Sequence, residues 1–68
     1  MNKQTLKGQW TQVKGQIRKQ WGKLTDDDLD QIKGDAEILA GRIQERYGRS
    51  KEEVSRELDR FFEQSDRA

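Results

Sequence analysis

Residues 21–29 read WGKLTDDDL, and this stretch decides the fold because it ends one helix and begins the next. Thr25 is a favourable N-cap, and the three aspartates after it occupy a first turn, where the helix dipole favours negative charge. Leu24 and Leu29 have the spacing of a hydrophobic staple. Gly22 has the place of a left-handed glycine that ends the preceding helix. The stretch therefore predicts two helices joined by a very short turn.

The residues before this stretch follow a helical pattern. Apolar side chains recur three or four positions apart, at Leu6, Trp10, Val13, Ile17, Trp21 and Leu24. This spacing predicts an amphipathic helix over residues 3–21. Gly8 and Gly15 lie on its side away from the apolar stripe, and each costs about 1 kcal/mol of helix propensity relative to alanine.

Gly34 interrupts the next apolar stretch. Its position predicts a helix over 26–33 and another over 35–47, with Asp35 as the N-cap of the second. The apolar phase runs smoothly across the glycine, so one bent helix over 26–47 is the alternative.

A capping-box pattern begins the last predicted helix. Ser50 has the N-cap position and Glu53 the N3 position, which predicts a helix over 51–63. No segment alternates with period two, so the sequence predicts an all-α fold, a small bundle of four short helices. We expect residues 1–64 to form a single helical domain and residues 65–68 to form a polar, disordered tail.

The apolar stripes of the four helices supply the predicted core. Its members are Trp10, Val13, Ile17, Trp21, Leu24, Leu29, Ile32, Leu39, Ile43, Tyr47, Val54, Leu58 and Phe61. Trp10, Ile17 and Leu39 are expected to be among the most buried residues, and Leu6 and Phe62 to lie at the rim. Ile38 lies off the stripe, and it is either simply exposed or the edge of a second contact surface.

The composition excludes most enzyme classes. The 68 residues include no cysteine and no histidine, and 40% of them are charged against 29% hydrophobic. A thiol nucleophile, a thiolate metal site and a histidine base are therefore absent. Ser50 has the role of a cap, and Glu52 and Glu53 stand among exposed charges. We expect no catalytic, cofactor-binding or metal-binding residues, and a monomer, because little apolar surface is left once the core is covered.

The acidic run after Thr25 invites a calcium interpretation. Asp26, Asp28 and Asp30 match the first three ligand positions of a calcium loop, and Glu37 matches the twelfth. Gln31 stands where that loop requires glycine. The helix-start signals also direct alternate aspartates to different sides, so helix-start chemistry is the favoured interpretation.

The first 25 residues carry six Lys or Arg and no acid, whereas all 13 acidic residues follow. Four of the cations lie along one flank of the predicted first helix, namely Lys3, Lys7, Lys14 and Arg18. This flank predicts at most weak, salt-sensitive contact with a polyanion. The alternative is that the basic and acidic parts of the chain attract each other within the fold. The turn at residues 33–36 has only one glycine and an acid, which disfavours a DNA-binding helix-hairpin-helix.

The strings WGKLTDDD at 21–28 and IQERYG at 43–48, together with Gly15, Gly34 and Gly41, resemble the CsbD-like family of small bacterial proteins. The resemblance extends from the amino terminus to about residue 58. It implies a bundle of two roughly orthogonal helical hairpins, similar to SAM-like domains, in a protein made during general stress. It carries no established activity and no catalytic residues.

Two function classes follow. The first is a non-enzymatic stress-response protein that acts by abundance, hydration or weak contacts. The alternative is a small interaction module whose basic first helix binds nucleic acid, an acidic partner or, less favourably, a membrane surface. Residues 1–10 lack the apolar run of a signal peptide, and no stretch has the length of a membrane span, which predicts a cytoplasmic protein. The sequence does not specify a partner.

Overall fold

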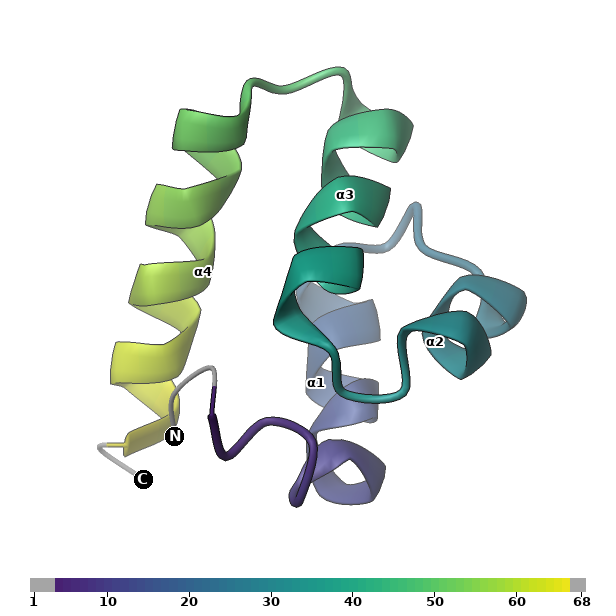
Figure 1. Cartoon of the computed structure of the whole chain (residues 1–68), viewed down its shortest axis with the longest axis vertical. Helices are drawn as coiled ribbons and strands as arrows, with labels where there is room; N and C mark the ends of the chain where they lie inside the picture. Colours follow the sequence, from purple (N-terminus) through teal and green to yellow (C-terminus); the bar gives the residue numbers. More distant parts are fainter. Residues whose placement is uncertain (1–3, 67–68) are drawn as a thin grey trace.

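The computed structural model describes residues 4–66, and these residues contain four helices and no strand (Figure 1). They are α1 (Trp10–Gln20), α2 (Asp26–Ile32), α3 (Ala36–Tyr47) and α4 (Lys51–Asp66). Helices α3 and α4 lie side by side, α2 packs against α3, and α1 lies behind them in this view (Figure 1). The prediction of a small all-α bundle of four short helices is confirmed.

The first helix begins later than the sequence predicts. Residues 4–9 form turns instead of the first part of a helix over 3–21, and Leu6 is fully buried rather than at the rim. The reason is a long-range contact. The backbone of Lys7 crosses the turn before α3 so closely that a Cβ atom at Gly34 would lie 2.5 Å from the Lys7 Cα. This crossing outweighs the local helix propensity.

The stretch after Thr25 forms two helices, as predicted, because two consecutive residues adopt left-handed conformations between them. Lys33 ends α2 with φ of 48°, and Gly34 follows with φ of 87°. Asp35 then caps α3, and its carboxylate accepts a hydrogen bond from the Glu37 amide at 2.9 Å. The bent single helix is therefore excluded.

The other helix ends confirm some capping predictions and correct one. Gly48 ends α3 with φ of 64°. Gly22 does not have a positive φ, so the prediction of a left-handed stop there is wrong. Helix α1 ends instead at Trp21, whose amide donates to the Ile17 carbonyl at 2.8 Å while its indole enters the core. Burial of this side chain sets the backbone geometry.

Helix α4 begins at the predicted capping box. The Glu53 amide donates to the Ser50 hydroxyl at 3.1 Å, and the Ser50 amide donates to the Glu53 carboxylate at 3.2 Å. The helix continues to Asp66, beyond the predicted end. The expected tail of residues 65–68 thus lies partly within α4, and residues 67 and 68 lie outside the described part. The domain boundary stays a prediction.

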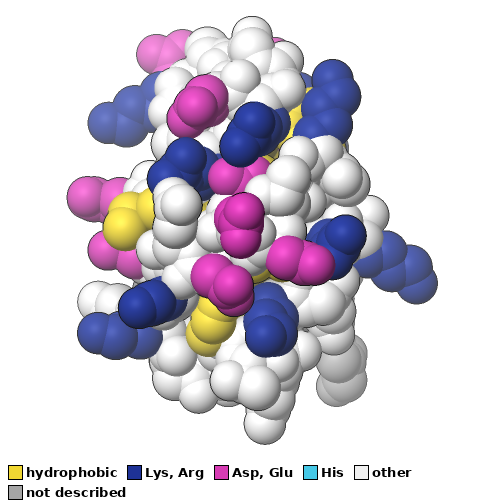
Figure 2. Space-filling view, turned by 90° about the vertical axis from the view of Figure 1, so that its right-hand side faces the viewer, with side chains coloured by type: hydrophobic (Ala, Val, Ile, Leu, Met, Phe, Trp, Pro, Cys, Tyr) yellow, Lys and Arg dark blue, Asp and Glu magenta, His cyan; other side chains and the backbone are white. Residues whose placement is uncertain are grey.

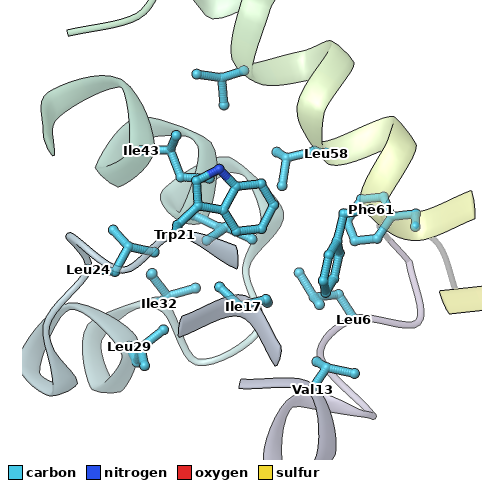
Figure 3. Close-up of a cluster of buried hydrophobic side chains, with 13 residues drawn as sticks. Leu6, Val13, Ile17, Trp21, Leu24, Leu29, Ile32, Ile43, Leu58 and Phe61 are labelled. Carbon is cyan, nitrogen blue, oxygen red and sulfur yellow. The ribbon is translucent and has the colours of Figure 1, made fainter. Parts of the chain in front are cut away.

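Trp21 lies at the centre of the core, among side chains from every helix (Figure 3). Its ring centroid is 5.4 Å from that of Phe61. The buried apolar residues are Leu6, Val13, Ile17, Trp21, Leu24, Leu29, Ile32, Leu39, Ile43, Val54, Leu58, Phe61 and Phe62. The expectation that Trp10 is among the most buried residues is wrong, since it packs against the core while partly exposed, and Phe62 is buried rather than at the rim.

Candidate functional site

The cations predicted to contact a polyanion do not form an uninterrupted basic strip. Lys7 lies in the turn before α1, and Lys14 and Arg18 lie on the flank of α1 that faces α2. Arg18 forms an ion pair with Asp26 at the start of α2. Lys3 lies outside the described residues. The polyanion site stays a prediction, and one of its four members already has an acidic partner within the fold.

A shallow hollow of about 420 Å³ separates α1 from α2. Its cationic side is formed by Lys14 and Arg18, its acidic side by Asp26 and Asp30, and Gly15 lies between the two cations. On the side of the molecule that carries α2, acidic and basic side chains are interspersed over the surface (Figure 2). This arrangement agrees with attraction between the basic and acidic parts of the chain.

Among the described residues, the charged residue that is buried is Asp28, with 2% of its surface exposed. Its carboxylate accepts a hydrogen bond from the Thr25 amide at 3.0 Å, and the Thr25 hydroxyl accepts one from the Asp28 amide at 3.1 Å. Arg46 of α3 donates from Nε and Nη2 to the two carboxylate oxygens, each at 3.0 Å. A bidentate arginine and a helix cap therefore share one carboxylate.

These contacts favour the ionised form of Asp28. The Arg46 guanidinium and the Thr25 amide lower the pKa of the Asp28 carboxyl from 3.8 to about 2, although burial opposes the shift. The Arg42 Nη1 atom lies 3.9 Å from the same carboxylate. At neutral pH the group is a stabilised anion whose two oxygens both accept hydrogen bonds, which suits it to hold α2 against α3 and not to transfer protons.

The predicted alternatives at the start of α2 can now be compared with the geometry. Asp28 turns inward, whereas Asp26 and Asp30 are exposed, so the three aspartates do not converge as calcium ligands. Ser50 serves as the α4 cap, as predicted. Among the described residues, no three acidic side chains are grouped to hold a metal ion.

A second polar network joins the turn between α1 and α2 to the turn between α3 and α4. The Tyr47 hydroxyl accepts a hydrogen bond from the Lys23 amide at 3.1 Å. Lys23 Nζ lies 5.1 Å and Arg49 Cζ 4.6 Å from the centre of the Tyr47 ring. Arg49 also pairs with Glu57, which accepts from the Trp21 indole at 3.3 Å. These cation–π and hydrogen-bond contacts tie the end of α1 to the start of α4.

A hollow of about 480 Å³ follows the outer face of the α3–α4 hairpin. The α3 side is formed by Ala36, Glu37, Ala40 and Gln44, and the α4 side by Lys51, Ser55 and Leu58. Both alanines are partly buried and Leu58 is buried, so the floor is apolar. The sequence prediction did not identify this groove, although Ala36, Ala40 and Gln44 follow each other at intervals of four.

The comparison with protein families matches residues 4–56 to the CsbD-like family. The chain belongs to the CsbD-like family. Its curated relatives carry the family name UPF0337. One from Bordetella pertussis is 48% identical over 65 residues, which cover 96% of this chain and 98% of the relative. One from Pseudomonas aeruginosa is 51% identical over 61 residues, covering 90% and 94%.

The UPF0337 protein YjbJ of Escherichia coli K12 is 50% identical over 58 residues, covering 85% of this chain and 84% of the relative. No solved structure matches the chain. The CsbD-like resemblance inferred from the WGKLTDDD and IQERYG strings is therefore confirmed. In the structure of this CsbD-like protein, those strings hold Asp28 and Arg46, which form an ion pair, and Tyr47, which accepts from the Lys23 amide.

Sequence reasoning did not identify the Asp28–Arg46 pair of this CsbD-like protein. The spacing of Thr25 and Asp28 is a capping-box signal that predicts the local half of the network. The other half joins residues that are 18 positions apart, and no local pattern indicates which of several arginines is the partner. No described helix is both long and apolar enough to cross a membrane.

Proposed function

We propose that this protein is a non-enzymatic stress-response protein of the bacterial cytoplasm, which acts through weak contacts of its folded surface. Membership of the CsbD-like family supports the stress role, since the family resemblance implies production in general stress. The composition, 40% charged and 29% hydrophobic residues, supports action at high concentration, because a surface with little exposed apolar area has few sites for aggregation.

The state of Asp28, the buried charged residue of the described part of the chain, supports the non-enzymatic part of the proposal. A catalytic acid or base needs a pKa near the working pH and a free position for the proton. Asp28 has a pKa of about 2, and both carboxylate oxygens accept hydrogen bonds from within the protein. The buried carboxylate is thereby used for the fold.

Two observations disfavour the alternative of a nucleic-acid module on the first helix. The Trp21 indole is buried and Trp10, although partly exposed, packs against the core, so neither offers a free ring face for base stacking, and Arg18 is paired with Asp26. We further propose that the chain acts as a monomer. Among the described residues, Ile38 is the large hydrophobic residue that is exposed, with 41% of its surface accessible. So small an exposed apolar area supports the monomeric state.

The test is a bacterial strain that lacks the gene, exposed to osmotic shock, drying and starvation, with survival counted against the parent. We expect lower survival in at least one stress and full rescue by the unmodified protein at its natural level. Equal survival of both strains in all three stresses would contradict the stress role.

A folding-defective variant separates the folded-surface mechanism from hydration alone. Trp21→Ala removes the largest core side chain while leaving the charge and the hydrophilic composition unchanged. We expect this variant, at matched abundance, to fail to rescue survival. Full rescue by an unfolded Trp21→Ala chain would show that hydration suffices and would overturn the proposal of a folded contact surface.

A further inference from the structure

The groove on the outer face of the α3–α4 hairpin has a floor of small apolar side chains. Ala36 and Ala40 lie one turn apart on α3, and Leu58 meets them from α4. Its side chains are too small to cover the hollow of about 480 Å³ between the helices. Such a shape accepts the apolar ridge of a further helix, which is a common mode of peptide recognition.

Gly41 lowers the α3 edge of this groove. It lies four positions after Glu37 and three before Gln44, so it stands between these two lining residues on the helix surface. Nothing lies within 4 Å of the position that its Cβ atom would occupy, and its φ is not positive. A glycine there costs about 1 kcal/mol of helix propensity, and no contact within the chain requires it. The open space over Gly41 leaves room for a partner to approach α3 closely.

The α4 edge of the groove is acidic. Ser55 lines the hollow, and its neighbours one turn away on α4 are Glu52 and Asp59, with Glu63 one turn further. These three carboxylates are exposed, and none forms an ion pair with another described residue. Arg56 lies one turn from both Glu52 and Asp59, so with Glu37 on the opposite edge four acids and two cations, Lys51 and Arg56, border the floor, and the net charge of this surface is negative.

We propose that this groove binds a basic amphipathic helix of a partner protein. The apolar face of that helix lies on Ala36, Ala40 and Leu58, and its Lys or Arg side chains pair with Glu52, Asp59 and Glu63. The proposal goes beyond the stress role and does not depend on it.

Charge decides between this partner and other occupants. A nucleic acid is repelled by an acidic rim. A second copy of the chain that docked the same face would bring two acidic rims together, which is unfavourable. A basic helix gains both from the apolar floor and from the carboxylates, so it fits the surface that the fold presents.

The probe for the test is a fluorescently labelled 18-residue peptide of leucine and lysine, patterned as an amphipathic helix. A matched peptide has glutamate at every lysine position. Fluorescence anisotropy with the folded protein is expected to show saturable binding of the basic peptide and none of the acidic peptide. Equal affinity for the two peptides would overturn the proposal.

Two variants locate the binding surface, each with a matched control. Glu52→Gln with Asp59→Asn is expected to weaken peptide binding about fivefold, because each exposed ion pair contributes a small increment. Asp27→Asn with Asp30→Asn changes the net charge equally on α2 and is expected to change affinity less than twofold. Equal effects of the two pairs would show that net charge, not the groove, binds the peptide.

Gly41→Gln raises the low edge and also improves helix propensity, so a loss of binding cannot come from unfolding. We expect it to weaken binding severalfold, whereas Gly15→Gln, at an equally open glycine of α1, leaves affinity unchanged. Unchanged affinity of Gly41→Gln would contradict the site. Self-association of the protein through this face, seen by sedimentation and abolished by Gly41→Gln, would make a second copy the occupant and overturn the proposed partner.

Discussion

On its inward side helix α3 places Leu39 and Ile43 in the core and holds Asp28 with Arg46, whereas on its outward side it exposes Ile38 and leaves Gly41 without a neighbour. The inward residues are fixed by contacts within the chain. The outward residues have no such requirement. The twelve residues of α3 thus divide into an inward face that stabilises the fold and an outward face that is available to other molecules.

Truncation of Trp21, which packs near Ile43, is expected to cause the largest effect on the inward side (Figure 3). Trp21→Ala should cost about 3–5 kcal/mol of unfolding free energy, measured by urea titration and circular dichroism. Trp10→Ala, at a partly exposed position, should cost less, about 1–2 kcal/mol. Equal losses for the two variants would contradict the central position of Trp21.

Loss of the Asp28 charge should weaken the tie between α2 and the inward side of α3. Asp28→Asn removes the charge-assisted bonds from Arg46 and is expected to cost about 2 kcal/mol at pH 7. Arg46→Gln should cost a similar amount, and the double variant less than the two single losses together, because both remove one interaction. Additive losses in this cycle would show that the two side chains act separately.

The same pair predicts how stability depends on pH. The pKa of Asp28 is about 2 when folded, below its ordinary 3.8, so the folded protein binds this proton less readily than the unfolded chain. The stabilisation is complete above about pH 5 and is mostly lost as the pH falls to about 2, an expected change of about 2 kcal/mol. Urea titrations at several pH values should show this decrease in the unmodified protein, and Asp28→Asn should lack that part of it.

Polyanion binding should be a smaller effect. A labelled oligonucleotide at about 0.15 M salt is expected to show little or no anisotropy change with the protein, because Arg18 is paired with Asp26 and the net charge is only +1. Weak binding at low salt should fall when Lys7 and Lys14 are changed to Gln. Submicromolar, sequence-dependent affinity would make the α1 flank a nucleic-acid site.

Local signals predicted the helices correctly where the physics is local. The caps at Thr25, Asp35 and Ser50 follow from hydrogen bonds within a few residues, whereas the predicted left-handed stop at Gly22 is wrong because Trp21 is drawn into the core. The start of α1 was wrong because it is set by a contact between Lys7 and Gly34, which are distant in sequence. Neither the apolar periodicity nor the composition of the sequence indicates which segments of the chain cross each other.

The two candidate surfaces, the basic flank of α1 and the α3–α4 groove, also combine features visible in the sequence with features that depend on packing. A run of cations in the first 25 residues is visible in the sequence, but the pairing of Arg18 with Asp26 of α2 depends on packing. The α3–α4 groove also requires two helices to be placed side by side. The sequence feature beside the groove is Gly41, a glycine that no local signal explains. Its role can be interpreted only once the space around it is known.

Alanine substitution at two glycines tests the difference between the two sides of α3 most directly. Gly34 has φ of 87° and lies against the Lys7 backbone, so Gly34→Ala should lower the free energy of unfolding by about 2–5 kcal/mol. Gly41 is helical and open, so Gly41→Ala should raise it by about 1 kcal/mol. Urea unfolding of both variants beside the unmodified protein is predicted to give shifts of opposite sign. Destabilisation by both would show that the outward side also serves the fold, and would contradict the account.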